Sequence, residues 1–312
     1  MTGGSLSRLR RLVWRARPPV LALGGGGARG FAHIGVLQVL EEEGLPMRML
    51  VGTSMGSVVG GMYLALGSAG EVLARWREAL DQGIIPSVDS ARRLPESETH
   101  EHPLLQMARR IRDRVVLSMA VNRRAMLGDK ELTRAFDFLV PDVDVGDLRR
   151  PFVAVATDLS TGEEVRLRSG SLRRVVTASS SIPGLLPPVE LEGRPLVDGG
   201  VLAEVPVNAA VECGRPVIAV DVSMDLPLLD DHGLALDTLM RTQLMTSRLL
   251  RAHQLSVVAH VIRPDVGHAT WADWGRFEEL VAAGRLAART WLDRNRLAST
   301  FPRLFGTRRG SR

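Results

Sequence analysis

The chain has 312 residues, 45% of them hydrophobic and 24% charged, which is enough to bury a sizeable core. Its single cysteine, Cys213, excludes an internal disulfide and a cysteine-based metal cluster, and it fits a reducing compartment. The net charge of +5 is carried almost entirely by arginine. This excess of arginine indicates either a GC-rich genome or contact with an anionic surface. We expect no nucleic-acid partner.

Arginines gather at both ends of the chain, where Arg8 and Arg17 bound one cluster and Arg303 and Arg312 the other. We expect basic tails at residues 1–17 and 301–312, either solvated or in peripheral contact with an anionic membrane. No run of about 18 apolar residues and no signal-peptide pattern is found. The expected location is therefore cytoplasmic, with or without membrane association, and the sequence leaves the oligomeric state open.

The predicted elements alternate between strands and helices along the chain. Short apolar runs predict strands at 19–23, 47–51, 152–158, 163–168, 195–197, 217–222 and 257–262. Helical periodicity predicts helices at 30–43, 54–66, 69–80, 104–120, 130–139, 172–179, 234–255 and 276–292.

Alternation of strand and helix predicts parallel pairing, with helices on both faces of the sheet. We therefore expect a single α/β domain at residues 18–300, a three-layer sandwich around a mainly parallel central sheet. Residues 87–103 are polar and contain prolines, so they are predicted to form a loop or a lid.

A run of glycines, Gly24 to Gly27, separates the first predicted strand from the first helix. Glycines leave backbone N–H groups uncovered, and the helix N-terminus adds a positive field, so the loop can hold a phosphate or a developing oxyanion. Gly25, Gly27 and Gly30 also match the spacing of a dinucleotide-binding loop. That interpretation requires an acidic residue at the end of the second strand, but residues 51–54 there are Val-Gly-Thr-Ser and none is acidic. A dinucleotide-binding oxidoreductase is therefore the weaker alternative.

The second motif is Gly52-Thr53-Ser54-Met55-Gly56, which follows a short apolar strand and precedes a helix. Gly-x-Ser-x-Gly in this context is typical of a nucleophile elbow, because small residues on both sides permit the tight turn that exposes the serine. Ser54 is therefore the candidate nucleophile, and it requires a base.

The favoured base is Asp198, at the end of a short predicted strand and followed by Gly199 and Gly200. The alternative for this segment is an ordinary Asp-Gly turn. None of the 7 histidines lies in an indicative neighbourhood. His33, in the helix after the glycine run, is better explained by local packing or capping than by catalysis.

In this order, the glycine loop, Gly-Thr-Ser-Met-Gly and Asp-Gly-Gly resemble the patatin-like phospholipase family, and residues 178–183 are similar to its small-residue segment before a proline turn. The resemblance covers about residues 19–225 and is closest to bacterial members, since plant members have aspartate in the place of Gly24. It implies hydrolysis of acyl esters of lipids, with no cofactor and no metal. The alternative from another class of function is a regulatory or scaffold protein, which would keep this fold with little turnover.

The resemblance also implies roles for individual residues. Ser54 and Asp198 match a catalytic dyad that works without histidine. The amides of Gly25, Gly26 and Gly27 match the oxyanion hole, and Arg29 matches an arginine that the family carries in this loop, with Gly30 beside it.

Overall fold

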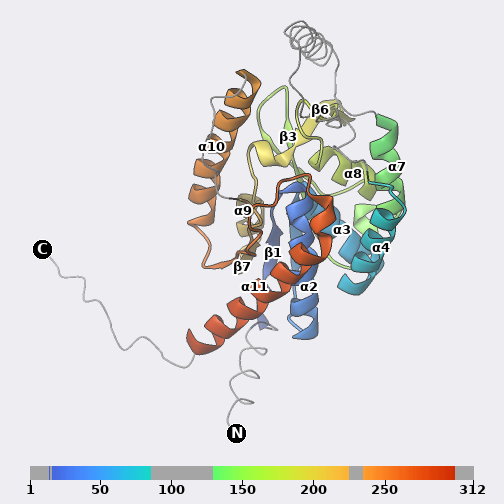
Figure 1. The fold of residues 1–312 in the computed structure, drawn as a ribbon. Helices are drawn as coiled ribbons and strands as arrows, with labels where there is room; N and C mark the ends of the chain where they lie inside the picture. The colour runs from blue at the N-terminus through green and yellow to red at the C-terminus, as the bar shows by residue number, and fades with distance from the viewer. Residues whose placement is uncertain (1–13, 15, 86–128, 225–234, 299–312) are drawn as a thin grey trace, which may run out of the picture.

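The computed structural model describes residue 14 and residues 16–85, 129–224 and 235–298. The predicted lid at 87–103, the predicted helix at 104–120, the C-terminal basic tail and most of the N-terminal one lie outside the described residues. Figure 1 shows the described part as one sheet with helices packed around it.

Eight strands form one sheet in the order β5-β6-β3-β2-β1-β7-β8, and β4 pairs with β3. The centre of the sheet is parallel, because β1 pairs in parallel with both β2 and β7. The pairs β3–β4, β3–β6 and β5–β6 are antiparallel. The strands are β1 Val20–Leu23, β2 Met49–Thr53, β3 Phe152–Asp158, β4 Glu164–Leu167, β5 Val189–Leu191, β6 Arg194–Asp198, β7 Val217–Val220 and β8 His260–Ile262.

Successive residues of a strand point to opposite faces of the sheet, and β1 shows how both faces are covered. Leu21 and Leu23 belong to the larger core cluster, whereas Val20 and Ala22 belong to a second cluster on the opposite face. The strand is therefore apolar throughout, as expected of a central parallel strand. This arrangement confirms the predicted three-layer α/β fold.

Helices α2, α3 and α11 contribute to the larger cluster, and α9 with the end of α10 contributes to the second one. The α-helices are α2 Phe31–Glu42, α3 Met55–Leu66, α4 Ala69–Asp81, α7 Asp129–Leu139, α8 Leu172–Ser179, α9 Val207–Val211, α10 Ala235–Leu255 and α11 Phe277–Ala298. The 3-10 turns are η1 Gly27–Gly30, η2 Val145–Asp147, η3 Gly199–Val201 and η4 Trp274–Arg276.

Some predicted boundaries differ from the observed ones. The strand predicted at 257–262 begins only at His260, because the amides of Val257 and Val258 bond back to the end of α10. The helix predicted from Gly30 is preceded by η1, since the chain turns tightly through the glycine run. Sequence patterns missed β5 and α9, which are too short to show a period.

Trp14 lies inside the predicted basic tail and nevertheless packs into the core. Its ring meets the ring of His260 edge to face, with centroids 5.6 Å apart, and only 8% of its surface is exposed. The predicted domain start at residue 18 therefore leaves out a side chain that contributes to the core.

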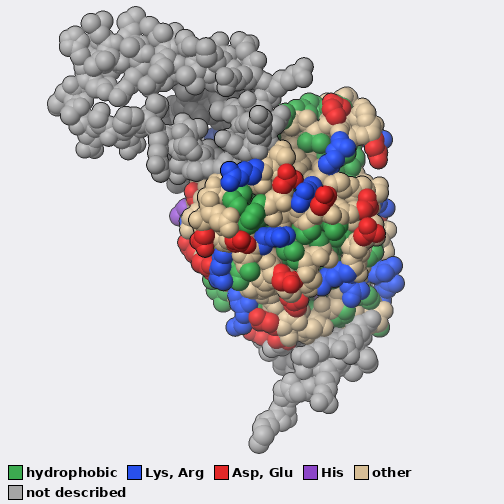
Figure 2. Space-filling view, turned by 90° about the vertical axis from the view of Figure 1, so that its right-hand side faces the viewer, with side chains coloured by type: hydrophobic (Ala, Val, Ile, Leu, Met, Phe, Trp, Pro, Cys, Tyr) green, Lys and Arg blue, Asp and Glu red, His purple; other side chains and the backbone are tan. Residues whose placement is uncertain are grey.

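Basic and acidic side chains are interspersed over the face that Figure 2 shows. Ion pairs on the surface, such as Arg77 with Glu278, add to this mixture. Among the described residues no single helix is long and apolar enough to cross a membrane. Helices α3 and α4 reach that length and composition only together, with a bend of 118° between them, and α3 is buried in the core.

Glycines allow helices α2 and α11 to approach each other closely. A Cβ on Gly284 of α11 would overlap the backbone carbonyl of Ala32, and a Cβ on Gly35 of α2 would overlap the backbone of Val281. Neither neighbour is the flexible end of a side chain, so the helices would have to separate to admit a methyl group. This contact keeps α2, and hence the glycine loop before it, against the body of the domain.

Gly284→Ala should therefore lower the stability of the protein by about 1–3 kcal/mol through overpacking. The measurement is thermal unfolding of both proteins under the same conditions. Gly275→Ala is the matched control, because a Cβ there would meet nothing within 4 Å. Equal melting temperatures for the two variants would contradict the close α2–α11 contact.

Candidate active site

Ser54 occupies the turn between β2 and α3, with φ 51° and ψ −127°. A positive φ is unfavourable for a residue with a Cβ, so the surrounding structure must impose it. The glycines on both sides make the turn possible. A Cβ on Gly52 would lie 2.5 Å from the amide nitrogen of Ser57, and one on Gly56 would overlap the carbonyls that end β1.

Hydrogen bonds hold this turn in place. The Ser54 amide donates to the Ser179 hydroxyl oxygen at 3.0 Å, and the Ser179 hydroxyl donates to the Val155 carbonyl at 2.6 Å. The Ser54 carbonyl accepts from both the amide and the hydroxyl of Ser57, at 2.8 and 2.7 Å. The backbone of Ser54 is thus fully bonded, and its side chain is left to react.

Sheet register brings Asp198 beside Ser54. Thr53 at the end of β2 lies opposite Val155 of β3, and the next residue of β3, Ala156, lies opposite Asp198 at the end of β6. The Asp198 side chain is 7% exposed. It accepts a hydrogen bond from the Gly200 amide at 2.7 Å, and the Ser54 hydroxyl lies close enough to lower its pKa.

The two glycines after Asp198 fit its turn. A Cβ on Gly199 would overlap the backbone carbonyl of Val155, so β6 can meet β3 closely only with a glycine there. A Cβ on Gly200 would lie 3.0 Å from the Asp198 carboxylate, beside the amide that bonds to it.

Burial raises the pKa of Asp198 to about 6, and repulsion from Glu204 adds to the rise. The hydrogen bonds from Ser54 and Gly200 act in the opposite direction, because they stabilise the carboxylate. A carboxylate with a pKa this close to neutral accepts a proton far more readily than an exposed one while remaining mostly ionised at pH 7.

The glycine loop lies against Ser54. A Cβ on Gly25 would be 3.2 Å from the Ser54 Cβ, which is closer than an ordinary van der Waals contact, so glycine eases this approach. The Gly25 amide already donates to the Glu204 carbonyl at 2.7 Å, and the Ala28 amide donates to the Trp271 carbonyl at 2.8 Å. Among the described residues, the amides of Gly26 and Gly27 have no such acceptor. Of the three amides that the resemblance implies for an oxyanion hole, that of Gly25 is therefore already bonded, and those of Gly26 and Gly27 remain candidates.

Two basic side chains support the loop from behind. The Arg29 Nε atom donates to the Gly26 carbonyl at 3.1 Å, and His33 Nε2 bonds to the Gly24 carbonyl at 2.7 Å. Burial lowers the pKa of His33 to about 4, so the ring is neutral at pH 7 and donates through Nε2. Gly30 allows the Met55 side chain to pack against the loop, because a Cβ on Gly30 would overlap that side chain.

A charged network that the sequence patterns did not reveal lies behind the loop. Arg251 of α10 pairs with Glu204 at 3.2 Å, and Asp221 pairs with Arg263 at 3.0 Å. Burial lowers the pKa of Arg29, while Glu204 and Asp221 act against that lowering. These residues come from distant parts of the chain and form no local motif, so only the fold could reveal the network.

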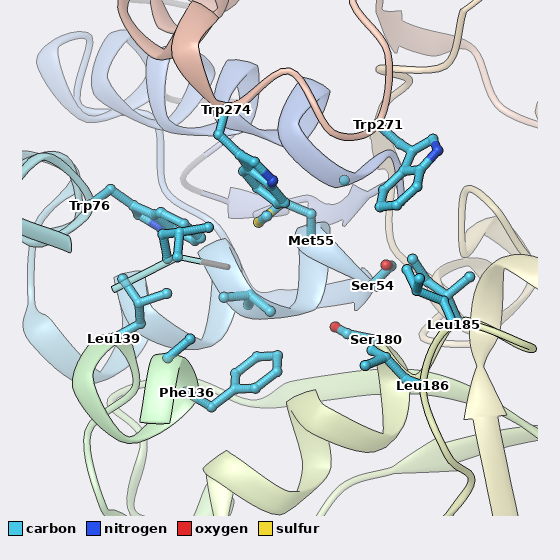
Figure 3. Close-up of a pocket in the computed structure, with 15 residues that line it drawn as sticks. Ser54, Met55, Trp76, Phe136, Leu139, Ser180, Leu185, Leu186, Trp271 and Trp274 are labelled. Atoms are coloured by element: carbon cyan, nitrogen blue, oxygen red, sulfur yellow. The ribbon is translucent and has the colours of Figure 1, made fainter. Parts of the chain in front are cut away.

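Ser54 lies at one end of an apolar pocket, shown in Figure 3. Its walls come from α3, α4, α7, the segment after α8 and the segment before α11. The lining side chains include Met55, Trp76, Phe136, Leu139, Leu186 and Trp274. Trp76 and Trp274 stack with an interplanar angle of 10°. Only 4% of the residues in the chain are aromatic, and several of these line this pocket.

The described residues contain no group of three or more His, Cys, Asp or Glu side chains arranged to hold a metal ion. The polar groups at the pocket are instead hydroxyls, backbone amides and the indole N–H groups of the lining tryptophans. This set suits attack on a carbonyl and stabilisation of the resulting oxyanion.

Comparison with known proteins agrees with this geometry. The model of the patatin-like phospholipase family matches residues 21–211, which include both Ser54 and Asp198. The chain belongs to the patatin-like phospholipase family. The family match stops before α10 and α11, the helices that contribute Arg251 and pack against α2.

Relatives from bacteria and mammals share this region. An uncharacterized NTE family protein of Mycobacterium tuberculosis is 35% identical over 187 residues, 60% of this chain and 44% of the relative. Human patatin-like phospholipase domain-containing protein 6 is 33% identical over 234 residues, 73% of this chain and 15% of that protein. The chain thus spans less than half the length of the first relatives.

Among solved structures, VipD from Legionella pneumophila is similar at 15% identity and a TM-score of 0.43, over 88% of this chain and 67% of that chain. ExoU of Pseudomonas aeruginosa, in its complex with SpcU, is similar at 18% identity and a TM-score of 0.42, over 90% of this chain and 53% of that chain.

Substitutions at Gly26 and Arg29 test two functions of the loop. The Gly26 amide, which has no acceptor among the described residues, is a candidate hydrogen-bond donor to a substrate, whereas Arg29 does not line the pocket and supports the loop backbone. A Cβ on Gly26 would press on the Val222 side chain at 3.0 Å and displace the amide. Gly26→Ala should therefore reduce the rate by up to about 10²–10³, the cost of a missing oxyanion donor. Because Gly26 has a φ of 157°, the added Cβ is also strained and should lower the melting temperature.

Arg29→Ala should lower both the esterase rate and the melting temperature, since it removes the hydrogen bond to the Gly26 carbonyl. Melting curves and esterase rates measured on both variants provide the comparison. A normal rate in Gly26→Ala would mean that this amide does not bind the oxyanion.

Proposed function

We propose that the protein is a serine hydrolase that cleaves acyl esters of lipids, with Ser54 as nucleophile and Asp198 as base. The observation that carries the proposal is the placement of the buried Asp198 carboxylate beside Ser54, which lines an apolar pocket next to two loop amides that have no acceptor among the described residues. Family membership supports the same class of reaction.

In the first half of the reaction, Asp198 accepts the proton of Ser54 as the serine oxygen attacks the ester carbonyl carbon. The carbonyl oxygen becomes an oxyanion and receives hydrogen bonds from the amides of Gly26 and Gly27. As the tetrahedral intermediate collapses, the bond to the alkoxy oxygen breaks and the proton held by Asp198 passes to the leaving alcohol. The acyl group remains on Ser54.

In the second half, a water molecule takes the place of the alcohol. Asp198 accepts a proton from the water, whose oxygen attacks the acyl carbon, and the same loop amides hold the oxyanion. The bond to the Ser54 oxygen then breaks, and the serine recovers a proton from Asp198. The free acid leaves, and the dyad is restored.

The pocket supports a long acyl chain as the group that is bound. Its walls include the side chains of Met55, Val58, Phe136, Leu139 and Leu186, which offer no hydrogen bonds to a polar substituent. An alkyl chain placed along them would be removed from water, a gain of roughly 0.8 kcal/mol per buried CH₂. We therefore propose that hydrolysis becomes faster as the acyl chain lengthens, up to the length of the pocket.

The two alternatives differ from this proposal in simple assays. Labelling of Ser54 by a fluorophosphonate probe requires an activated serine, which a scaffold protein with an idle site would lack. Binding of a nicotinamide cofactor without probe labelling would favour the oxidoreductase. A panel of glycerolipids and short-chain esters, with Ser54→Ala as the blank, then defines the substrate.

Ser54→Ala and Asp198→Asn should each remove most ester hydrolysis, because the first lacks the nucleophile and the second cannot accept its proton. Asp198→Asn should not lower the melting temperature, since it removes a buried charge whose burial is unfavourable. His33→Ala should be milder in rate, because His33 supports the loop and does not reach Ser54. An inactive His33→Ala beside an active Asp198→Asn would show that the base is misassigned.

The pH dependence should report the state of Asp198. Only its ionised form accepts a proton, so kcat/KM should rise with pH through about 6 and level off above it. If His33 were the base, the rise would lie near its pKa of about 4. The measurement is kcat/KM for a short-chain ester from pH 4 to 8, as about ten points. Circular dichroism at each pH confirms that the protein remains folded.

A further inference from the structure

Three consecutive serines follow one another where α8 ends, and their hydroxyls have different surroundings. The Ser179 hydroxyl bonds to the Ser54 amide and the Val155 carbonyl. The Ser181 hydroxyl donates to the Thr177 carbonyl at 2.8 Å. The Ser180 hydroxyl is shielded from solvent and has no hydrogen-bond partner among the described residues.

The backbone of Ser180 does not need its side chain. Its amide donates to the Thr177 carbonyl at 3.1 Å, and its carbonyl accepts from the Ile182 amide at 3.0 Å. A hydroxyl that is removed from water without a partner is unfavourable, and most buried polar groups in proteins avoid that state. The unbonded hydroxyl therefore calls for a partner that arrives with a ligand.

Ser180 lines the same pocket as Ser54, and Figure 3 shows the oxygens of both hydroxyls directed into it. In that view Ser54 lies between Trp271 on one side and Ser180 on the other. The backbone of Trp271 packs against the glycine loop, because a Cβ on Gly27 would overlap it. The side of Ser54 that faces Trp271 is therefore the side on which the glycine loop lies. Ser180 is therefore on the side of Ser54 that faces away from the oxyanion loop.

This placement decides which substrate atom meets Ser180. In the tetrahedral intermediate the carbonyl oxygen points to the amides of Gly26 and Gly27, and the acyl chain follows the apolar walls. The alkoxy oxygen of the ester is the remaining polar substituent, and it lies away from the loop. Resting on the hydrolase function proposed above, we propose that the Ser180 hydroxyl donates a hydrogen bond to the alkoxy oxygen of the leaving group.

The hydrogen bond strengthens as the carbon–oxygen bond breaks and negative charge gathers on the alkoxy oxygen. Ser180 keeps its own proton, and the proton that completes the alcohol comes from Asp198. When water replaces the alcohol, its oxygen occupies the same place and meets the same hydroxyl. Ser180 is thus a substrate-contacting residue that favours esters with poor, alkyl leaving groups.

Two esters with the same acyl chain test this role, one with a 4-nitrophenyl and one with an ethyl leaving group. Nitrophenolate leaves readily without assistance, whereas ethoxide needs its charge stabilised. Ser180→Ala should lower kcat/KM for the ethyl ester by about 10- to 10²-fold, the range for a hydrogen bond to a charged group. For the nitrophenyl ester it should change kcat/KM by less than about threefold.

Ser181→Ala is the matched control, since the Ser181 hydroxyl donates to the Thr177 carbonyl of α8. A purely structural loss there should lower kcat/KM for both esters by the same factor. Ser180→Thr keeps a hydroxyl and should restore part of the ethyl ester rate. Melting temperatures of the three variants verify that each is folded.

An equal effect of Ser180→Ala on both esters, or no effect on either, would overturn the proposal. The failure of the hydrolase function has a different signature. In that case the wild type would neither turn over the nitrophenyl ester nor react with a fluorophosphonate, and the role of Ser180 would fall with it.

Discussion

The site depends on the backbone of Ser54, which is held at a positive φ between β2 and α3. A non-glycine residue adopts this conformation only when its surroundings compensate for the strain. Here Ser179 binds its amide, and Ser57 binds its carbonyl twice. Since Gly52 and Gly56 leave no room for a Cβ, any change at these positions would disturb both the strand and the helix that present the serine.

The burial of Asp198 has opposite consequences for the stability of the protein and for the role proposed for this residue as base. Burial raises its pKa toward neutral, which makes the carboxylate a better base and its ionised form less favourable to bury. The sign follows from comparing the two states. The folded protein binds a proton at Asp198 more readily than the unfolded chain does, so the stability contribution of this group improves as pH falls through about 6 toward 3.8. The role proposed for Asp198 as base has the opposite dependence, because only the ionised form can accept a proton.

Distant parts of the chain position the glycine loop. The Gly25 amide bonds to the carbonyl of Glu204, whose side chain is held by Arg251 of α10. The loop also leads into α2, which packs against α11 through Gly35 and Gly284. The part of the chain beyond the family match therefore supports the loop from two sides, and strain introduced there should reach the amides of Gly26 and Gly27.

Local patterns in the sequence were sufficient to propose a nucleophile and a base and to predict the order of most strands and helices. The glycine run, Gly-x-Ser-x-Gly and Asp-Gly-Gly each express a steric requirement of a few neighbouring residues, and such requirements can be read from neighbours alone. Apolar runs likewise predicted β1 and β3, because a strand buried on both faces has few alternatives.

Tertiary structure alone decided how those pieces combine. The register of β2, β3 and β6 brings Asp198 to Ser54. The resemblance implied three loop amides, but Gly25 bonds to Glu204, and within the described residues Gly26 and Gly27 are the two of these three without an acceptor. Ser179, Ser180 and Ser181 are identical in sequence and differ only in what surrounds them. Hydrogen bonding and burial depend on residues that are remote along the chain, and so the environment of each group is settled only when the sheet and its helices close around it.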